Sequence, residues 1–189
     1  MSSLPPPAEL LRALSAALAR LNAGWYVFGA QAVLHWGRPR FTEDVDVTVE
    51  LGAVDLSRLV RSLEDAGFTI RDEGSAAFIE QTRVLPLLHT ASDWPLDLVI
   101  GGPGLEEDFL RRAVPVIIAP GLTVRMISAE DLIVTKILAG RPKDIDDVRG
   151  IVLAQRSTLD ADVVRATLAM LEDALGVSDL LPVFEGLYQ

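Results

Sequence analysis

Apolar positions recur along this chain with two periods, one typical of helices and one typical of strands. Over residues 8–21, Leu10, Leu14, Leu18 and Leu21 follow a near-helical spacing, which predicts a helix with one apolar face. Similar patterns, bounded by glycine or proline, predict the other elements of the first two thirds. These are helices at residues 29–36, 56–66, 75–84 and 105–112, and strands at residues 25–28, 42–50, 68–71, 85–89, 96–100, 114–118 and 122–125.

The last third of the chain contains only helical patterns. Ser128 precedes a helix that ends at Gly140, and Pro142 fits the first position of the next helix. Two more helices are expected near residues 160–175 and 177–186.

This order of elements predicts an α/β (α+β) fold, in which helices flank a mixed sheet. Residues 1–126 would form the α/β core with its N-terminal helix, and residues 127–189 a helical part packed on that core. No apolar run reaches the roughly 18 residues of a membrane span, and no basic segment suggests a secretory signal. The absence of cysteine excludes disulfides and thiolate metal sites. We therefore expect a cytoplasmic protein.

The formal net charge of -10 bears on the choice of partner. Proteins that track long nucleic acids are usually basic. A small phosphate compound, or nucleic acid bound at a local basic patch, is therefore a better expectation, although acidity can also serve solubility alone.

Two aspartates interrupt the predicted strand at residues 42–50. Asp44 and Asp46 are two positions apart, so they share one face of the strand, while the neighbouring valines share the other. Like charges on one face of a strand repel each other. Asp97 is a further lone charge in an apolar run, and burial of an unpaired carboxylate is costly.

Three carboxylates without His or Cys nearby in sequence suit a hard cation such as Mg²⁺, if the two strands are neighbours. The chemistry indicated is phosphoryl or nucleotidyl transfer with two ions. A solvated acidic strand face is the simpler alternative. Gly29 lies between an apolar strand and a helix, where free backbone N–H groups can bind phosphate, but an ordinary turn would look the same.

These residues resemble the signature of the nucleotidyltransferase superfamily that includes DNA polymerase beta. Phe28-Gly29-Ala30, a short gap, Asp44-Val45-Asp46-Val47 and then Asp97 follow its order. Within the superfamily the chain is similar to the AbiEii-type toxin group, through Arg40-Phe41-Thr42-Glu43 and through residues 130–148. The likeness spans residues 25–148, most of the chain. Ala30 departs from the usual Gly or Ser, so a hydroxyl contact to the triphosphate would be lost there.

The resemblance implies a nucleotidyltransferase-like fold and a Mg²⁺-dependent transfer of an NMP from an NTP to a hydroxyl of RNA, a protein or a small molecule. Asp44 and Asp46 would hold two metal ions, and Asp97 would contribute to the second ion and help deprotonate the acceptor. The implied partners are an NTP, a tRNA or protein acceptor and a cognate antitoxin, in a toxin–antitoxin or phage-defence system. The residues implied to contact the nucleotide are Gly29, Ala30, Arg40, Thr42, Lys136, Arg141, Lys143 and Asp144.

The basic residues near Gly140 have a structural alternative. Lys136 lies in the last turn of one predicted helix, and Asp144 in the first turn of the next, where such charges stabilise the helix dipoles. Their spacing alone does not separate this role from nucleotide binding.

Two further functions stay open. A degenerate member of the same fold could bind a nucleotide or a partner protein without catalysis, which Ala30 favours. Asp44-Val45-Asp46-Val47-Thr48 also matches the first motif of haloacid dehalogenase-like phosphohydrolases, but that motif normally ends an apolar strand, whereas here the apolar residues follow Asp44.

Overall fold

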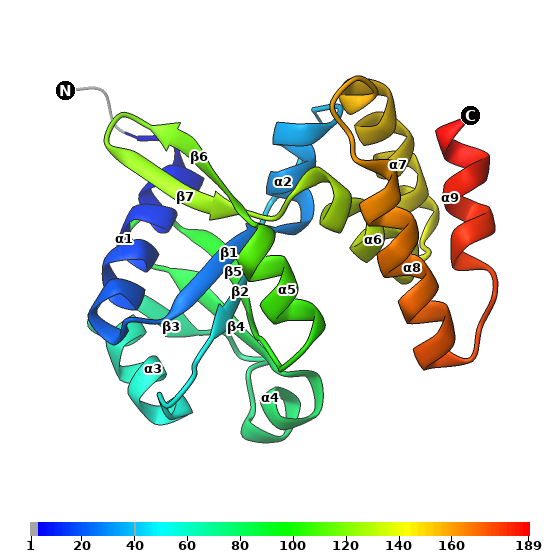
Figure 1. Cartoon of the computed structure of the whole chain (residues 1–189). Helices are drawn as coiled ribbons and strands as arrows, with labels where there is room; N and C mark the ends of the chain where they lie inside the picture. Colours follow the sequence, from blue (N-terminus) through cyan, green and yellow to red (C-terminus); the bar gives the residue numbers. More distant parts are fainter. Residues whose placement is uncertain (1–3, 40) are drawn as a thin grey trace. The chain divides into compact units, whose positions relative to one another are not determined.

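The computed structural model describes residues 4–39 and 41–189, and Figure 1 shows their helices and strands. The chain forms two compact units. The first comprises Met1–Gln31 and Thr42–Ile127, and the second comprises Ala32–Phe41 and Ser128–Gln189. Helix α2 (Gly29–Trp36) begins in the first unit and ends in the second. The predicted domain boundary after residue 126 stays a prediction, since compactness does not show independent folding.

A seven-stranded sheet forms the centre of the first unit, within the described residues. Its order is β3-β4-β5-β2-β1-β7-β6. The pairs β2/β5 and β1/β7 are parallel and the other neighbours are antiparallel. The sheet is therefore mixed, which confirms the predicted fold class. The strands are β1 (Gly24–Phe28), β2 (Val45–Glu50), β3 (Phe68–Ile70), β4 (Val84–His89), β5 (Trp94–Ile100), β6 (Val114–Ala119) and β7 (Leu122–Met126).

The two central strands β2 and β5 have one apolar face and one face that carries charge. Asp46 and Asp97 are cross-strand partners in the parallel register, so their side chains share a face. Both are half-buried. The opposite face is formed by fully buried side chains, Val45, Val47, Val49, Leu96 and Leu98.

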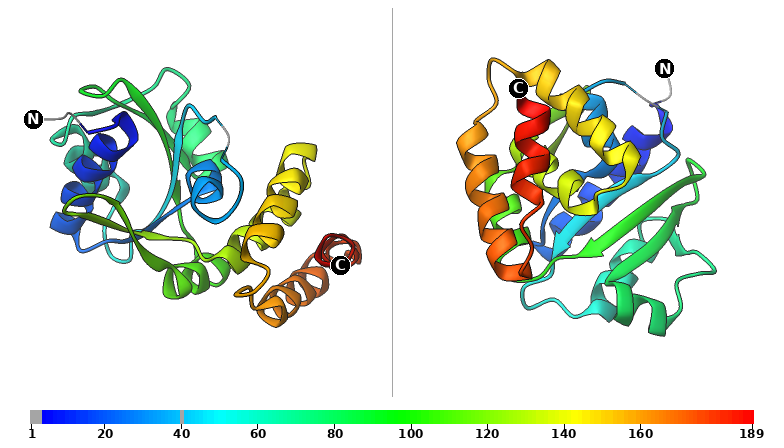
Figure 2. Two further views of the ribbon diagram at one scale, coloured as in Figure 1. Left: turned by 90° about the horizontal axis from the view of Figure 1, so that it is seen from above. Right: turned by 90° about the vertical axis from the view of Figure 1, so that its right-hand side faces the viewer.

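Helices α1 (Pro6–Leu21) and α3 (Leu56–Glu64) pack on each other, and α1 also contacts β5 and β7. Both lie on one side of the sheet in Figures 1 and 2. They bury the leucines of their apolar faces, Leu10, Leu14, Leu18, Leu59 and Leu63. Helix α4 (Ala76–Thr82) contacts β4, and α5 (Leu105–Arg112) contacts β1.

The second unit is helical, as the right view of Figure 2 shows for its four later helices. These are α6 (Ala129–Ala139), α7 (Pro142–Gln155), α8 (Ala161–Leu175) and α9 (Leu180–Tyr188). Their core contains Leu132, Ile133, Val148, Ile151, Val164, Leu168 and Phe184, all below 2% exposed. Gln155 Nε2 donates a hydrogen bond of 2.9 Å to the carbonyl of Trp36, which ties the end of α2 to α7. None of the helices described is both long and apolar enough for a membrane span.

Two predicted element starts differ from the structure by three residues, the largest differences among the described elements. The strand predicted from residue 42 starts at Val45, because the Thr42 hydroxyl bonds locally to the Asp44 carboxylate at 2.7 Å and its carbonyl at 3.4 Å. The last helix starts at Leu180 rather than at residue 177, because Gly176 ends α8 with φ of +68° and the chain needs several residues to turn.

Candidate active site

Gly29 forms the turn between β1 and α2, with φ of +62°. A Cβ atom at this position would lie 1.9 Å from Oδ2 of Asp46, a severe overlap. Phe28, the preceding residue, is the cross-strand partner of Asp46. The absence of a side chain at Gly29 therefore makes room for the Asp46 carboxylate. Ala30, which follows in the first turn of α2, is only 6% exposed.

The three predicted carboxylates come together in the first unit. Asp44, Asp46 and Asp97 each have a carboxylate oxygen within 4.8 Å of those of the other two. The parallel pairing of β2 with β5 causes this, since it places Asp97 beside Asp46, two residues from Asp44. Among the side chains described, no other group of three acids or histidines is close enough to share one ion.

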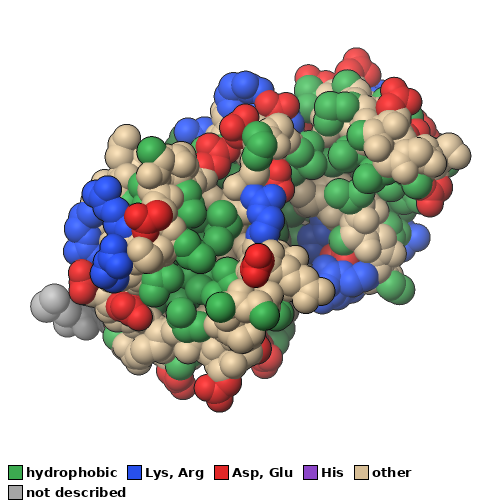
Figure 3. Space-filling view, turned by 90° about the horizontal axis from the view of Figure 1, so that it is seen from below, with side chains coloured by type: hydrophobic (Ala, Val, Ile, Leu, Met, Phe, Trp, Pro, Cys, Tyr) green, Lys and Arg blue, Asp and Glu red, His purple; other side chains and the backbone are tan. Residues whose placement is uncertain are grey.

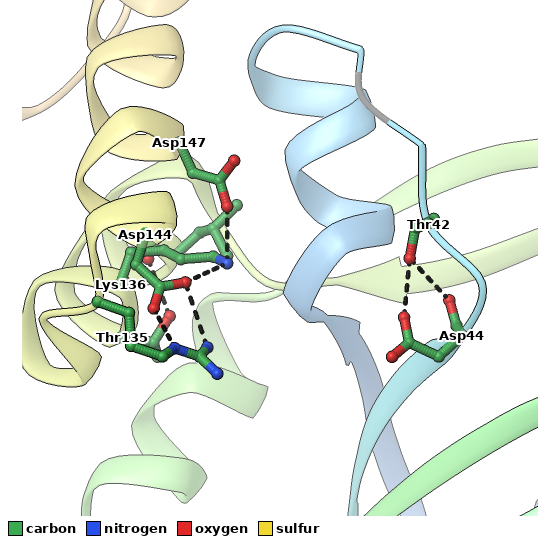
Figure 4. Close-up of polar contacts among 8 residues, drawn as sticks. Thr42, Asp44, Thr135, Lys136, Asp144 and Asp147 are labelled. Carbon is green, nitrogen blue, oxygen red and sulfur yellow. Dashed lines mark hydrogen bonds and ion pairs between the residues drawn. The ribbon is translucent and has the colours of Figure 1, made fainter.

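Asp44 is held by two neighbours at the entrance to β2. The Thr42 hydroxyl donates to its Oδ1 at 2.7 Å, as Figure 4 shows. Gln31, from α2, donates through Nε2 to the Asp44 carbonyl at 3.3 Å. The first contact orients the Asp44 carboxylate, and the second holds the Asp44 backbone just before β2.

Asp97 forms an ion pair with Arg71, which follows β3. Arg71 Nε also lies 3.3 Å from Oε1 of Glu73. Burial raises the pKa of the Asp97 carboxyl; the Arg71 charge lowers it, but Asp44 and Glu73 add to the rise, and the net shift is upward. A carboxyl with a raised pKa is a better proton acceptor than an ordinary one.

The donor set fits a hard divalent cation. It consists of carboxylate oxygens alone, and each of the three side chains is half-buried rather than sealed from solvent. Mg²⁺ prefers oxygen ligands, needs only one or two carboxylates and keeps water and phosphate oxygens in its shell. An open triad of this kind suits that requirement better than a closed cage.

The predicted basic cluster forms a buried ion network in the second unit (Figure 4). Lys136 is 6% exposed, and its Nζ lies 2.9 Å from both Asp144 Oδ1 and Asp147 Oδ2. Asp144 is fully buried and also accepts hydrogen bonds from Arg141, at 2.5 Å from Nε and 3.3 Å from Nη2. Lys143 is exposed.

This network changes the interpretation of the junction. Lys136 and Asp144 do lie in the last turn of α6 and the first turn of α7, as the helix-dipole alternative expects, but they also pair directly and are buried. Asp144 has no exposed surface for a nucleotide, so a direct contact needs the network to open. Arg141 is 60% exposed on its side chain and Lys143 is exposed, so their predicted contacts need no such change.

The predicted residues are thus distributed over both units. Gly29, Ala30, Thr42 and the three carboxylates lie in the first unit, whereas the Lys136 network lies in the second. Arg40 lies outside the described residues. The face in Figure 3 carries acidic and basic side chains close to one another.

Sequence reasoning missed several polar partners. Arg71 and Glu73 stand in a charged turn that resembles any solvated loop, so no local pattern distinguishes them. Gln31 follows the glycine turn, and nothing in the local sequence predicts its contact with the Asp44 carbonyl. The spacing of Asp144 and Asp147, one helical turn apart, could have indicated a shared partner for Lys136.

Solved structures with the same fold include several nucleotidyltransferases. The antibiotic-resistance factor ANT(2'')-Ia superposes with a TM-score of 0.60 and 18% identity, over 92% of this chain and 97% of that chain. A nucleotidyltransferase-like antigenic protein from Paracoccidioides brasiliensis gives 0.54 and 18%, over 97% and 95%. The lincosamide antibiotic adenylyltransferase LnuA gives 0.50 and 16%, over 76% and 94%. At these identities the likeness concerns the fold.

A search of curated proteins gave no match. A profile of one protein family, however, matches residues 8–179, nearly the whole chain. That range includes the carboxylate triad, the glycine turn and the buried ion network. The chain therefore belongs to the family described as nucleotidyltransferase of unknown function (DUF6036).

Proposed function

We propose that this protein transfers a nucleoside monophosphate from an NTP to a hydroxyl group, with Mg²⁺ as cofactor. The observation that carries the proposal is the convergence of Asp44, Asp46 and Asp97 within 4.8 Å, in a chain of a nucleotidyltransferase family. Two divalent ions bound there would neutralise the phosphates and stabilise the charge that develops on the leaving group.

Asp97 is the proposed proton acceptor. The acceptor oxygen attacks the α-phosphorus, the bond from that phosphorus to the bridging oxygen breaks, and pyrophosphate leaves. The hydroxyl proton passes to the Asp97 carboxylate, which acts as a general base. Asp44 and Asp46 would hold the ions, and Thr42 and Gln31 keep Asp44 in place.

The proposed nucleotide contacts fall into two groups. Backbone N–H groups of Gly29 and Ala30 at the start of α2 would bind phosphate. Arg40 and Thr42, which precede Asp44 in the chain, would also contact the nucleotide. Arg141 and Lys143, which are exposed, would contact the nucleotide through their charges. Lys136 and Asp144 would act by holding Arg141 and the start of α7 in position.

The acceptor class stays open among RNA, protein and small molecules. LnuA is described as a lincosamide antibiotic adenylyltransferase, so a small-molecule acceptor is compatible with this fold. The resemblance to the AbiEii-type group favours a tRNA or protein acceptor and a toxin whose antitoxin is encoded nearby. We extend the proposal to a cytoplasmic toxin of this kind.

The test uses labelled substrates. The purified protein is incubated with Mg²⁺, each α-labelled NTP, and either total tRNA or a panel of hydroxyl-bearing small molecules. We expect label transfer and equimolar pyrophosphate, both abolished in Asp46→Asn. No transfer and no pyrophosphate, together with Mg-NTP binding that does not depend on Asp46, would contradict the proposal.

A second function is a nucleotide-binding module without catalysis. Ala30 favours it, because a methyl group cannot donate the hydrogen bond that a Ser hydroxyl gives to a triphosphate. Intact, Asp46-dependent Mg-NTP binding without any product would support the module. The phosphohydrolase alternative gains no support, since Asp44 precedes β2 rather than ending a strand.

The toxin role has its own test. Induced expression of the wild-type chain should slow growth of a bacterial host, and Asp46→Asn should remove that effect at equal protein level. Co-expression of the adjacent reading frame should restore growth. Equal growth with the wild type and Asp46→Asn would argue for a housekeeping or antibiotic-modifying role.

A further inference from the structure

A row of cross-strand neighbours extends the carboxylate triad across the sheet. Asp46 pairs with Asp97 on β5, and Asp97 pairs with Pro86 on β4. Beyond β4, the backbone N–H of Arg71 donates to the Pro86 carbonyl at 3.0 Å and so continues the ladder from β3. Directly paired residues share a face of a sheet. The row therefore places Arg71 two strands from Asp97, on the face of the triad.

Arg71 reaches over β4 to this carboxylate. Two strand spacings amount to about 10 Å, and Pro86 between them is buried and uncharged. The guanidinium Nη2 of Arg71 binds Oδ1 of Asp97. The side chains of Arg71 and Asp97 are 29% and 35% exposed, so the pair is only partly open to solvent.

A tight turn fixes the base of the Arg71 side chain. The Gly74 N–H donates to the Arg71 carbonyl at 2.9 Å. A Cβ atom at Gly74 would lie 2.3 Å from Cγ2 of Ile70 and 3.1 Å from Cγ of Pro86, so the turn packs closely on β3 and β4. Glu73 lies in this turn, with Oε1 at 3.3 Å from Arg71 Nε. The Glu73 contact is an ion pair without hydrogen-bond geometry, so the hydrogen bond to Asp97 is what directs the guanidinium.

We propose that Arg71 is a positioning residue of the triad, which holds one oxygen of Asp97 so that the other is presented to the cation beside Asp44 and Asp46. The inference rests on the proposed metal site but not on catalysis. A carboxylate can accept from a guanidinium and bind a cation at once, because its two oxygens offer about four lone-pair sites. Without Arg71, repulsion from Asp44 and Asp46 would turn the Asp97 carboxylate away.

The test must separate the charge of Arg71 from its positioning of Asp97. Loss of a positively charged side chain next to a metal site by itself strengthens the attraction of the site for the metal ion. Arg71→Gln combined with Glu73→Gln leaves the net charge of the pair unchanged. Arg71→Lys keeps the charge but loses the planar fork that orients a carboxylate. Arg58→Gln, an exposed arginine of α3, serves as the control for loss of an arginine in the same unit.

The measurement is Mn²⁺ affinity, by electron paramagnetic resonance of the free ion, on proteins shown to be folded by circular dichroism. Loss of an outer partner of a metal ligand typically weakens metal binding about 10–100-fold. We expect that loss in Arg71→Gln/Glu73→Gln, a smaller loss in Arg71→Lys, and wild-type affinity in Arg58→Gln.

Wild-type Mn²⁺ affinity in both Arg71→Gln/Glu73→Gln and Arg71→Lys would overturn the proposal and leave Arg71 as a counter-charge only. Should the double variant not fold, Arg71→Lys decides alone. The outcome is separate from the proposed enzyme activity: Mn²⁺ binding that depends on Asp46 and Arg71, without NMP transfer, would refute only the activity.

Discussion

Gly29 and the carboxylate of Asp46 occupy adjoining space, so that a Cβ atom on Gly29 would overlap Oδ2 at 1.9 Å. The sequence indicates Gly29 as a position where backbone N–H groups can bind phosphate. In the structure, the missing side chain of Gly29 also makes room for one of the proposed metal ligands. The two motifs of the signature thus depend on each other, because the glycine turn determines where the second aspartate can lie.

Gly29→Ala should abolish Mn²⁺ binding and NMP transfer, because the added methyl group displaces Asp46. The positive φ adds a strain of about 1–2 kcal/mol for a residue with a side chain. Gly121→Ala provides a matched control, since Gly121 has φ of +70° and open space around a Cβ atom. Denaturant unfolding should show the backbone strain alone in Gly121→Ala and a larger loss of stability in Gly29→Ala, where the overlap with Asp46 adds to that strain. Mn²⁺ titration should show loss only in Gly29→Ala. Normal Mn²⁺ binding by Gly29→Ala would show that Asp46 can move without consequence.

A divalent cation should raise the stability of the wild-type chain. A ligand that binds only the folded state at 100 times its Kd stabilises by about 2.7 kcal/mol. We expect Mn²⁺ or Mg²⁺ to shift the unfolding midpoint and EDTA to reverse the shift. Asp46→Asn and Asp97→Asn should lose the response, whereas Asp65→Asn, an exposed aspartate of the same unit, should keep it. An equal shift in all four proteins would mean that the cations bind elsewhere.

Lys136→Met should destabilise the helical unit by about 3–5 kcal/mol, the usual effect of removing one partner from a buried ion pair. The reason is that Asp147 and one oxygen of Asp144 lose the ammonium group that lies 2.9 Å away. Lys143→Met, at an exposed position, should change stability by less than about 0.5 kcal/mol. Urea unfolding followed by circular dichroism measures both. Loss of NTP affinity in Lys136→Met with unchanged stability would instead support a direct nucleotide contact.

Acid should weaken the same network. Burial by itself raises the pKa of the Asp144 carboxyl, but hydrogen bonds from Arg141 and Lys136 outweigh it and hold that pKa below its usual 3.8. Because the pKa of Asp144 is lower in the folded state, its ionised carboxylate contributes fully to the free energy of unfolding above pH 3.8. That contribution is lost as the pH falls through the folded-state pKa. Unfolding free energies between pH 2 and 6 should therefore fall toward acid in the wild type.

Asp144→Asn supplies the control for that profile, because an amide does not titrate. It should be less stable than the wild type at pH 6, and the difference should shrink as the pH falls below 3.8. A constant difference across the range would assign the acid sensitivity to other carboxylates.

The sequence predicts the order and type of every helix and strand described, because apolar periodicity and glycine or proline boundaries are local. It also identified Asp44, Asp46 and Asp97, since charges within apolar strands are conspicuous wherever the strands lie. The strand start at Val45 was missed because a side-chain hydrogen bond from Thr42, which no apolar pattern records, holds the preceding residues outside the ladder.

Which of these residues meet depends on strand pairing and helix packing. The parallel pairing of β2 with β5 brings Asp97 to Asp46, and the β3-β4-β5 order brings Arg71 to Asp97. The burial of Lys136 between Asp144 and Asp147 likewise depends on the packing of α6 on α7. Pairing and burial are long-range properties, set by which apolar faces close on one another, whereas sequence patterns report only what each residue's near neighbours allow.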